Sequence, residues 1–322
     1  MRLKETINNR FTTASRNEEL GFTDKYEKRN QRVLNKNGNF SVIRKGVKTG
    51  IFHKLLTMSW WRFSFFVLAF YSLANLFFAF LYLVIDYNGV GYTSDYQVHD
   101  RFLMAFFFSA QTITTVGYGS LYPLSWLISL LAATEALIGL MSFAIFTGVM
   151  YGRFSRPVHG IRFSDSAVIA PYKGGYSFQF RVGNEMTNNL INLEAKALLS
   201  IVVTEGEKQI RRFQPITLEN NRINYLSLNW TCVHPINDQS PLFGLTEQDF
   251  MAGNIEIIVM VEGFNDAYAQ VVHARSSYTW DEIEWNKKFE LPYYFDEAGL
   301  TVFDIDKLGI TAPVAQQVAA AN

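Results

Sequence analysis

The chain has 322 residues, of which 49% are hydrophobic, and its formal net charge at pH 7 is zero. A neutral chain gives no global electrostatic support for binding nucleic acid, so we expect no nucleic-acid partner. The single cysteine, Cys232, excludes a disulfide within the chain and indicates a reducing compartment.

The first segment, residues 1–46, is polar and rich in Asn, Lys, Arg and Glu. It lacks the apolar core of a secretory signal, so we expect no cleavable signal peptide. Its composition predicts a cytoplasmic N-terminal segment that is partly disordered.

Residues 47–57, VKTGIFHKLLT, read as a short amphipathic helix. Val47, Ile51 and Leu55 recur every four positions and would form one apolar stripe, with the lysines elsewhere on the helix. This pattern predicts a helix lying in a membrane interface, and a plain linker helix is the alternative.

Two long apolar segments follow. Residues 63–85 contain no charged side chain, and residues 120–152 contain only Glu135. At about 1.5 Å rise per residue, either segment could cross a hydrocarbon layer of about 30 Å, whereas buried helices of a soluble protein are the alternative. The predicted boundaries are residues 60–86 and 124–154 for the spans and 58–157 for the membrane domain.

The basic residues predict the orientation of these spans. Residues 1–62 hold fourteen Lys and Arg, residues 63–152 hold only Arg101, and residues 153–322 hold fourteen more. By the positive-inside rule, both termini lie in the cytoplasm. Because no cleavable signal is expected, the chain is predicted to be a multi-pass protein of the plasma membrane, in bacteria the inner membrane.

Between the spans, residues 100–113 are largely apolar but too short to cross, which predicts a re-entrant helix. TITTVGYGS follows at residues 112–120, where Gly117 and Gly119 can adopt positive φ without a Cβ penalty. Non-helical backbone at membrane depth is tolerated only where protein buries it or water reaches it. Alternating glycines could turn successive carbonyl oxygens the same way, and the second span would begin after Pro123.

The C-terminal half predicts a β-structure. Tyr176, Phe178, Phe180 and Val182 alternate with polar residues, which is the period of a half-buried strand. Further β-branched runs are separated by turn signals, so residues 158–305 read as a cytoplasmic β-sandwich of immunoglobulin type. Composition alone would equally suit a sugar-binding module. Residues 306–322 read as a C-terminal tail.

Several blocks in order give the chain a family resemblance: WWRF, AFFFSAQTITTVGYG, TGVMYGRFSRP, FSDSAVIAPYKGGYSFQFRVGN, HPINDQSPLFG and VEGFNDAYAQVVHARSSY. They resemble the inward-rectifier potassium channels, most closely the prokaryotic, KirBac-type branch. The resemblance covers about residues 40–305. It implies an α+β membrane protein with two transmembrane helices, a re-entrant pore helix, a filter and an immunoglobulin-like cytoplasmic β-sandwich. It also implies a homotetramer, because one chain supplies one filter loop and the ring needs four.

The resemblance assigns roles to individual residues. The filter would be Thr115, Val116, Gly117, Tyr118 and Gly119, with K⁺ held at the first four of these. K⁺ is then the permeant ion, and no cofactor is implied. Phe143, Thr147 and Tyr151 lie four apart on the second span and would line the pore, with Tyr151 as the gate. Glu135 would lie behind the filter or border the cavity, and the sequence leaves both open.

Other positions depart from the family pattern. The family has a glutamate where Gln111 stands and a charged residue where Ser120 stands, so filter rigidity is in question. The acidic positions of strong rectifiers are here Phe143, Asn192 and Arg222, and only Glu262, in the loop of the cytoplasmic pore, is acidic. Missing carboxylates predict weak block by polyamines.

Basic residues at the cytoplasmic interface predict regulation by lipid. Arg62, Arg153 and Arg156 match family positions that meet anionic lipid or phosphoinositide, and Lys54 lies in the interfacial helix. A positive-inside pattern without a specific site is the alternative. Gating would then follow lipid binding or rearrangement of the cytoplasmic domain.

Two other functional classes, a sensor and an enzyme, compete with a K⁺ channel. A membrane-anchored sensory β-sandwich with a non-conducting pore is the main alternative to a passive K⁺ channel. An enzyme is not expected, because the five histidines are scattered and no nucleophile motif surrounds Cys232.

Overall fold

The computed structural model describes residues 32–46, 50–93, 100–156, 160–205 and 208–314. The chain forms two compact units, one of residues 45–156 and one of residues 1–44 with 157–322. Each unit has its own hydrophobic core.

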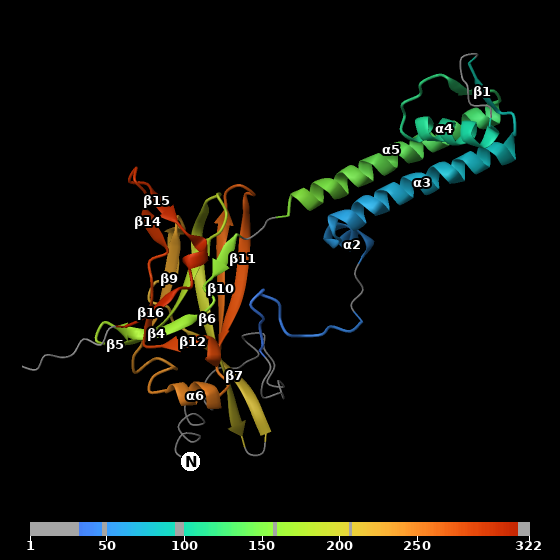
Figure 1. The fold of residues 1–322 in the computed structure, drawn as a ribbon. Coiled ribbons are helices and arrows are strands. Elements are labelled where there is room, and N and C mark those ends of the chain that lie inside the picture. The colour runs from blue at the N-terminus through green and yellow to red at the C-terminus, as the bar shows by residue number, and fades with distance from the viewer. Residues whose placement is uncertain (1–31, 47–49, 94–99, 157–159, 206–207, 315–322) are drawn as a thin grey trace, which may run out of the picture. The chain divides into compact units, whose positions relative to one another are not determined.

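The helical unit contains α2 (Ile51–Thr57), α3 (Trp60–Ile85), α4 (Arg101–Ile113) and α5 (Trp126–Phe154), with α3 and α5 side by side (Figure 1). α3 and α5 have 26 and 29 residues and are apolar enough to cross a membrane. α5 begins two residues later than predicted, because Ser125 caps it through the N–H of Ile128. The residues just before, Leu121–Pro123, form β2, which pairs with β1 (Val90–Tyr92).

α4 is the predicted re-entrant helix. It begins at Arg101 because the Asp100 carboxylate accepts a hydrogen bond from the N–H of Leu103 at 2.9 Å. Its 13 residues rise about 20 Å, which is too short to cross a bilayer. It packs against α3 and α5 through buried residues Phe78, Ala79, Tyr82, Met104, Ala105, Phe108 and Ile128.

α2 lies within the segment predicted as an interfacial helix. It begins at Ile51, and residues 47–49, including Val47 of the predicted stripe, lie outside the described residues. Ile51 and Phe52 are exposed, whereas Leu55 and Leu56 are half-buried, and Leu56 faces Gly152 of α5. One side of α2 therefore packs on α5 and another stays apolar and open.

The second unit is a β-sandwich of two five-stranded sheets around one core (Figure 1). One sheet has the order β11 (Gln270–Thr279), β10 (Glu256–Asn265), β6 (Leu190–Glu205), β7 (Lys208–Ile216), with β8 (Arg222–Tyr225) beside β6. The other has the order β12 (Ile283–Trp285), β4 (Ala167–Tyr172), β5 (Gly175–Asn184), β3 (Ile161–Phe163), with β9 (Asn229–Ile236) beside β5. α6 (Glu247–Ala252) precedes β10.

β5 differs from the half-buried strand that its alternation predicted. Phe178, Phe180 and Val182 face the core, but Ser177 and Arg181 on the other face are buried too. The Arg181 guanidinium stacks 4.7 Å from the Phe289 ring and donates to Thr231 and to the carbonyl of Glu290. Burial lowers the pKa of Arg181 to about 10. C-terminal chain therefore covers the outer face of this sheet.

That covering chain extends the folded unit past the predicted boundary at residue 305. β13 (Lys287–Phe289) pairs with β16 (Thr311–Pro313), and β14 (Tyr293–Phe295) pairs with β15 (Thr301–Phe303). Leu308 is buried close to Gly183 of β5. Residues 306–313 thus belong to the sandwich unit, and the predicted tail 306–322 is wrong for them; residues 315–322 lie outside the described residues.

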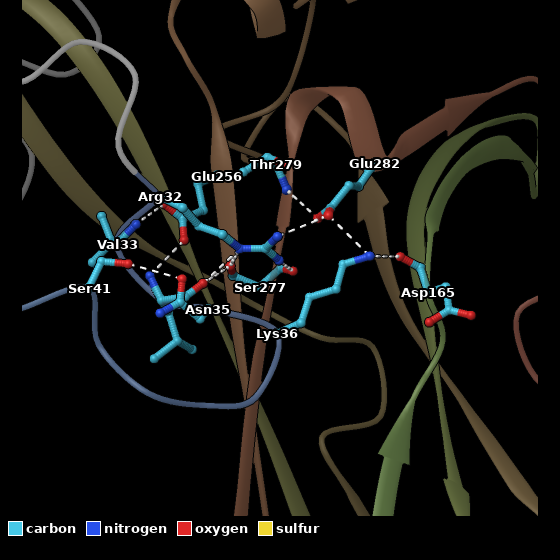
Figure 2. Close-up of polar contacts among 11 residues, drawn as sticks. Arg32, Val33, Asn35, Lys36, Ser41, Asp165, Glu256, Ser277, Thr279 and Glu282 are labelled. Carbon is cyan, nitrogen blue, oxygen red and sulfur yellow. Dashed lines mark hydrogen bonds and ion pairs between the residues drawn. The ribbon is translucent and has the colours of Figure 1, made fainter.

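Part of the N-terminal segment, which was predicted to be partly disordered, is folded against the sandwich. Residues 32–41, called here the strap, lie on the outer face of the β10–β11 sheet (Figure 2). Val33 and Leu34 are fully buried and pack against Phe213 and Ile258. Residues 1–31 lie outside the described residues.

A buried carboxylate holds the strap. Glu256 on β10 is 1% exposed and accepts the N–H groups of Val33 at 2.7 Å and Leu34 at 3.0 Å (Figure 2). Its Oε2 also accepts from Arg211 of β7 at 3.1 Å. Arg32 forms an ion pair with Glu282 at 2.9 Å. Each of these charged side chains is buried or half-buried beside a partner that is distant in the sequence, so composition alone does not predict their positions.

Candidate functional site

The turn that follows α4 alternates in backbone handedness. Thr115, Gly117 and Gly119 have φ of 57°, 55° and 79°, and Val116 and Tyr118 between them do not have positive φ. Such alternation turns successive peptide planes the same way, so N–H groups gather on one side and carbonyls on the other. The positive φ predicted as accessible to the two glycines is therefore adopted, and Thr115 adopts it as well.

Gln111 collects the N–H groups of this turn. Its backbone carbonyl accepts from Val116 at 2.9 Å and Gly117 at 3.2 Å, and its side-chain Oε1 accepts from Tyr118 at 3.2 Å. Its Nε2 donates to the carbonyl of Leu121 at 3.3 Å, on the far side of the turn. Three consecutive N–H groups are thus bonded to Gln111, whereas no hydrogen bond from a described residue reaches the carbonyls of the same peptides.

The side chains of the turn are uncovered within one chain. Val116 is 52% exposed and Tyr118 is 80% exposed. They line a hollow of ≈ 380 Å³ together with Gln111, Ser120 and Tyr71. Gly117 and Gly119 have no atom within 4 Å of an ideal Cβ. The described residues of this chain therefore leave both side chains largely without packing partners.

The inner helix α5 meets the end of α4 at one glycine. An ideal Cβ on Gly139 would lie 2.0 Å from the carbonyl oxygen of Ile113, so only glycine fits there. Nearby, α3, α4 and α5 enclose an apolar cavity of ≈ 430 Å³ lined by Thr115, Phe143 and Phe146 among others. Gly148 has no neighbour within 4 Å of an ideal Cβ, so it serves no such close approach within the chain.

The predicted pore-lining residues share one exposed surface of α5. Phe143 is 72% exposed and Tyr151 is 74% exposed, and Thr147 between them is exposed as well. Positions four apart lie close together along one side of a helix. The described residues of the helical unit therefore leave this row of side chains largely uncovered.

Glu135 has the opposite environment. Its side chain is fully buried, and its carboxyl oxygens lie 2.5 Å from Tyr82 Oη on α3 and 2.5 Å from Ser109 Oγ on α4. Of the two positions left open by the sequence, it occupies the one behind the pore helix. The sequence analysis did not single out Tyr82, Ser109 or Asn75, although Asn75 is a carboxamide within an otherwise apolar run and could have been noticed.

Arg153 does not have the free guanidinium expected of a lipid ligand. Its Nη1 donates to the carbonyl of Leu55 at 2.5 Å and its Nη2 to that of Met58 at 2.8 Å, at the C-terminal end of α2. The guanidinium also lies 4.5 Å from the Trp60 ring and 4.7 Å from the Phe63 ring. Cations stabilise helix C-termini, so Arg153 joins α5 to the end of α2. The other predicted headgroup residues, Lys54, Arg62 and Arg156, are exposed.

Glu262 lies within strand β10, and not in the loop where it was expected. Its Oε2 lies 3.6 Å from His273 Nδ1 on β11, and its backbone is opposite Glu194 on β6. Arg222, at a position that is acidic in strong rectifiers, forms an ion pair with Glu194 at 2.7 Å. Hydrogen bonds from Arg222 and Lys196 hold the pKa of Glu194 below its ordinary value.

Metal-ligating side chains do not gather in the part of the chain that the structure describes. No group of three His, Cys, Asp or Glu in these ranges could hold a metal ion. The turn after α4 offers a cation its backbone carbonyl oxygens and the hydroxyl oxygens of Thr115 and Tyr118. Such oxygens suit a weakly held alkali-metal ion in transit.

Comparisons with known proteins agree with this geometry. The family model described as "Inward rectifier potassium channel C-terminal domain" matches residues 161–322, and the one described as "Ion channel" matches residues 66–156. The chain is 36% identical to the inward rectifier potassium channel Kirbac3.1 of Paramagnetospirillum magnetotacticum, over 81% of this chain and 89% of that protein.

Eukaryotic relatives are longer than this chain. The inward rectifier potassium channel irk-1 of Caenorhabditis elegans is 27% identical over 97% of this chain and 62% of its own length. The human inward rectifier potassium channel 18 is 33% identical over 62% of this chain and 48% of its own length. Two helices that are long and apolar enough to cross a membrane flank the glycine turn, and a family model matches the β-sandwich. Together with these relatives, this shows that the chain belongs to the inward-rectifier potassium channel family, with a KirBac-type relative among its matches.

Proposed function

We propose that four copies of this chain surround one axis and conduct K⁺ passively through the turn of residues 115–119. The observation that carries the proposal is the convergence of three consecutive N–H groups on Gln111, while no described residue donates a hydrogen bond to the carbonyls of the same peptides. Four such turns would present rings of oxygens at Thr115, Val116, Gly117 and Tyr118 that replace the hydration shell of the ion.

The uncovered surfaces of the helical unit support a homotetramer. Val116 and Tyr118 are exposed beside the filter, and so are Phe143 and Tyr151 on α5. A neighbouring copy would cover the first pair, while the second pair would face a shared pore. A ring of four Tyr151 side chains at the end of α5 would close the pore by dewetting, with Phe143 and Thr147 lining the path above it.

We further propose that anionic lipid acts on the exposed basic residues Lys54, Arg62 and Arg156. Each such residue gains about 1 kcal/mol near an anionic surface. The distribution of Lys and Arg supports cytoplasmic termini. The similarity to the channel of Paramagnetospirillum magnetotacticum supports a bacterial inner membrane. Arg153 would then pass a movement of α2 to the gate rather than bind a headgroup, because its Nη groups are bonded to α2 carbonyls.

The deciding experiment is ion flux into liposomes that contain the purified chain. We expect rubidium uptake that barium blocks and that excludes sodium, from particles with the mass of four chains. Tetramers that pass no ion in any lipid mixture would favour the membrane-anchored sensor, and equal passage of Na⁺ and K⁺ would refute the filter assignment.

A matched pair of variants tests the turn itself. Gly117 and Gly174 both have positive φ, and an ideal Cβ on either would meet nothing within 4 Å. Alanine at either site therefore brings a similar strain, about 1–2 kcal/mol, but only Gly117 lies in the proposed filter. We expect Gly117→Ala to abolish selective rubidium uptake and Gly174→Ala to leave it unchanged. Equal flux from both variants would contradict the assignment.

A further inference from the structure

A chain of buried polar groups connects α3, α4 and α5 behind the turn. The side chains of Asn75, Tyr82, Ser109 and Glu135 are all fully buried. Asn75 Nδ2 donates to the carbonyl of Tyr71 at 2.7 Å, and Asn75 Oδ1 lies 3.0 Å from Ser109 Oγ. Ser109 Oγ lies 2.5 Å from one oxygen of Glu135, and Tyr82 Oη lies 2.5 Å from the other.

The protons of this chain can be counted. The amide of Asn75 is oriented by the Tyr71 carbonyl, because the reversed amide would place two acceptor oxygens together. Its Oδ1 therefore needs a proton from Ser109. A serine hydroxyl has only one proton, so the same Ser109 cannot also donate to Glu135.

If Glu135 were ionised, either the Ser109–Asn75 contact or the Ser109–Glu135 contact would join two oxygen atoms with no proton between them. With a protonated Glu135, every contact is satisfied. Tyr82 donates to one carboxyl oxygen, the other carboxyl oxygen donates its proton to Ser109, and Ser109 donates to Asn75. Buried polar groups in proteins nearly always have hydrogen-bond partners, which favours the second arrangement.

The charges around the carboxyl group favour the same arrangement. Between residues 63 and 152 the only Lys or Arg is Arg101, in the first turn of α4 and two helical turns before Ser109, and the one histidine, His99, lies outside the described residues. Within the described residues, no Lys, Arg or His forms an ion pair with Glu135, and the facing titratable group is the neutral phenol of Tyr82. A buried carboxylate without a cation is strongly disfavoured.

We propose that Glu135 is a neutral, hydrogen-bond-donating acid that positions the pore helix through Ser109. Ser109 lies two residues before Gln111, whose amide holds Tyr118 and Leu121 on the two sides of the filter turn. These hydrogen bonds hold α4 against α3 and α5, and they therefore set the position of Gln111 and its acceptor atoms. Filter support in this chain then comes from two uncharged side chains, Gln111 and protonated Glu135. The inference rests on the proposed conduction function.

The neutral amide variant tests the proposal in liposomes. Glu135→Gln places an N–H donor toward Ser109 and keeps an acceptor for Tyr82. We expect its rubidium flux and exclusion of sodium to stay within about threefold of the wild type, whereas Glu135→Leu, which can neither donate nor accept, loses about tenfold or more. Loss of selective flux in Glu135→Gln with the tetramer intact would show that a charge is required and would overturn the proposal.

Infrared difference spectra of the full chain test the proton independently of conduction. We expect the wild type minus Glu135→Gln to show the C=O stretch of a protonated carboxyl at neutral and alkaline pH, shifted in Ser109→Ala. The exposed Glu247→Gln should show carboxylate bands instead. Carboxylate bands from Glu135 would overturn the proposal. If the wild type did not select K⁺, the proposed conduction function would be refuted. The spectra would still show whether Glu135 is protonated.

Discussion

At the scale of single residues, the filter region depends on how many donors and acceptors each side chain offers. A carboxylate at position 111 could accept from Tyr118 but could not donate to Leu121, whereas the amide of Gln111 does both. The replacement of a family glutamate by glutamine therefore changes the brace of the turn without removing it. The turn whose rigidity the sequence puts in question at Gln111 and Ser120 therefore still has a side-chain brace at Gln111.

The contact of α5 with the end of α4 gives a prediction at Gly139. Gly139→Ala places a methyl group 2.0 Å from the Ile113 carbonyl oxygen, so one helix must move. We expect at least about 1–3 kcal/mol of destabilisation and a large loss of rubidium flux. The control is Gly148→Ala, where the methyl group meets nothing within 4 Å in the chain and helix propensity improves. Wild-type flux from Gly139→Ala would contradict the close approach.

His234 gives a prediction of pH dependence in the sandwich. Its ring is buried, with Nδ1 2.6 Å from the Thr217 carbonyl and Nε2 2.7 Å from Ser240 Oγ. Burial lowers the pKa of His234, so below its ordinary value of about 6.5 the unfolded chain binds a proton that the folded chain resists. Stability is therefore complete above about pH 6.5 and declines as the pH falls, by at most about 1.4 kcal/mol per unit.

Thermal unfolding of the full chain in detergent at about pH 7.5 and about pH 5.5 measures this effect, since the two values lie on either side of the ordinary histidine pKa. We expect His234→Gln to be less stable at the higher pH and to lose part of the decline between the two. The exposed His53→Gln should keep the wild-type decline. If the stability of His234→Gln fell as much as that of the wild type between these two pH values, His234 would not be the cause of the pH dependence.

At the scale of elements, the strap is part of the sandwich fold and not an appendage. Its backbone N–H groups donate to the Glu256 carboxylate (Figure 2). Its apolar residues pack against Phe213 and Ile258. Burying the Arg211–Glu256 pair, with both side chains 1% exposed, is tolerable because the strap supplies further donors. The N-terminal part of the sandwich unit ends at residue 44, and α2 begins at Ile51. Few residues of the chain therefore separate the strap from α2.

The strap gives a prediction for Glu256→Gln. The variant removes a charge that Arg211 and two N–H groups share, and breaking a buried pair costs about 3–5 kcal/mol. We expect faster deuterium exchange in peptides covering residues 32–41 and a lower unfolding temperature. The exposed Glu297→Gln is the matched control. Unchanged exchange in the strap of Glu256→Gln would show that the carboxylate does not hold it.

Local pattern made the spans, the re-entrant helix and the core strands predictable, because apolar runs, the Asp100 cap and alternation are written in consecutive residues. The strap, the pairing of β13 with β16 and the partners of Arg153 were not predictable, since each depends on residues far apart in the chain. Glu262 was misplaced for a related reason: β10 runs on to Asn265, past the position where a loop was expected. The turn of residues 115–119 was singled out by its motif, but the hydrogen bonds that Gln111 makes to it were visible only in three dimensions.

At the scale of the whole molecule, the distribution of charge along the proposed pore decides rectification. Phe143 is uncharged, Arg222 is basic and paired with Glu194, and Asn192 is neutral. Glu262 is partly exposed but has His273 at 3.6 Å. A multivalent cation therefore meets few unpaired carboxylates on its way to the filter, and little Coulomb attraction holds it there.

This gives a prediction for block by spermine from the cytoplasmic side. We expect shallow, weakly voltage-dependent block of wild-type currents in planar bilayers. Phe143→Asp would add a ring of four carboxylates to the pore and should make the block steep, because each charge adds to the attraction in a confined, low-dielectric path. Phe143→Asn, which changes size and polarity without charge, should stay shallow. Steep block of the wild type, or equal block of the Asp and Asn variants, would show that charges other than those at position 143 control rectification.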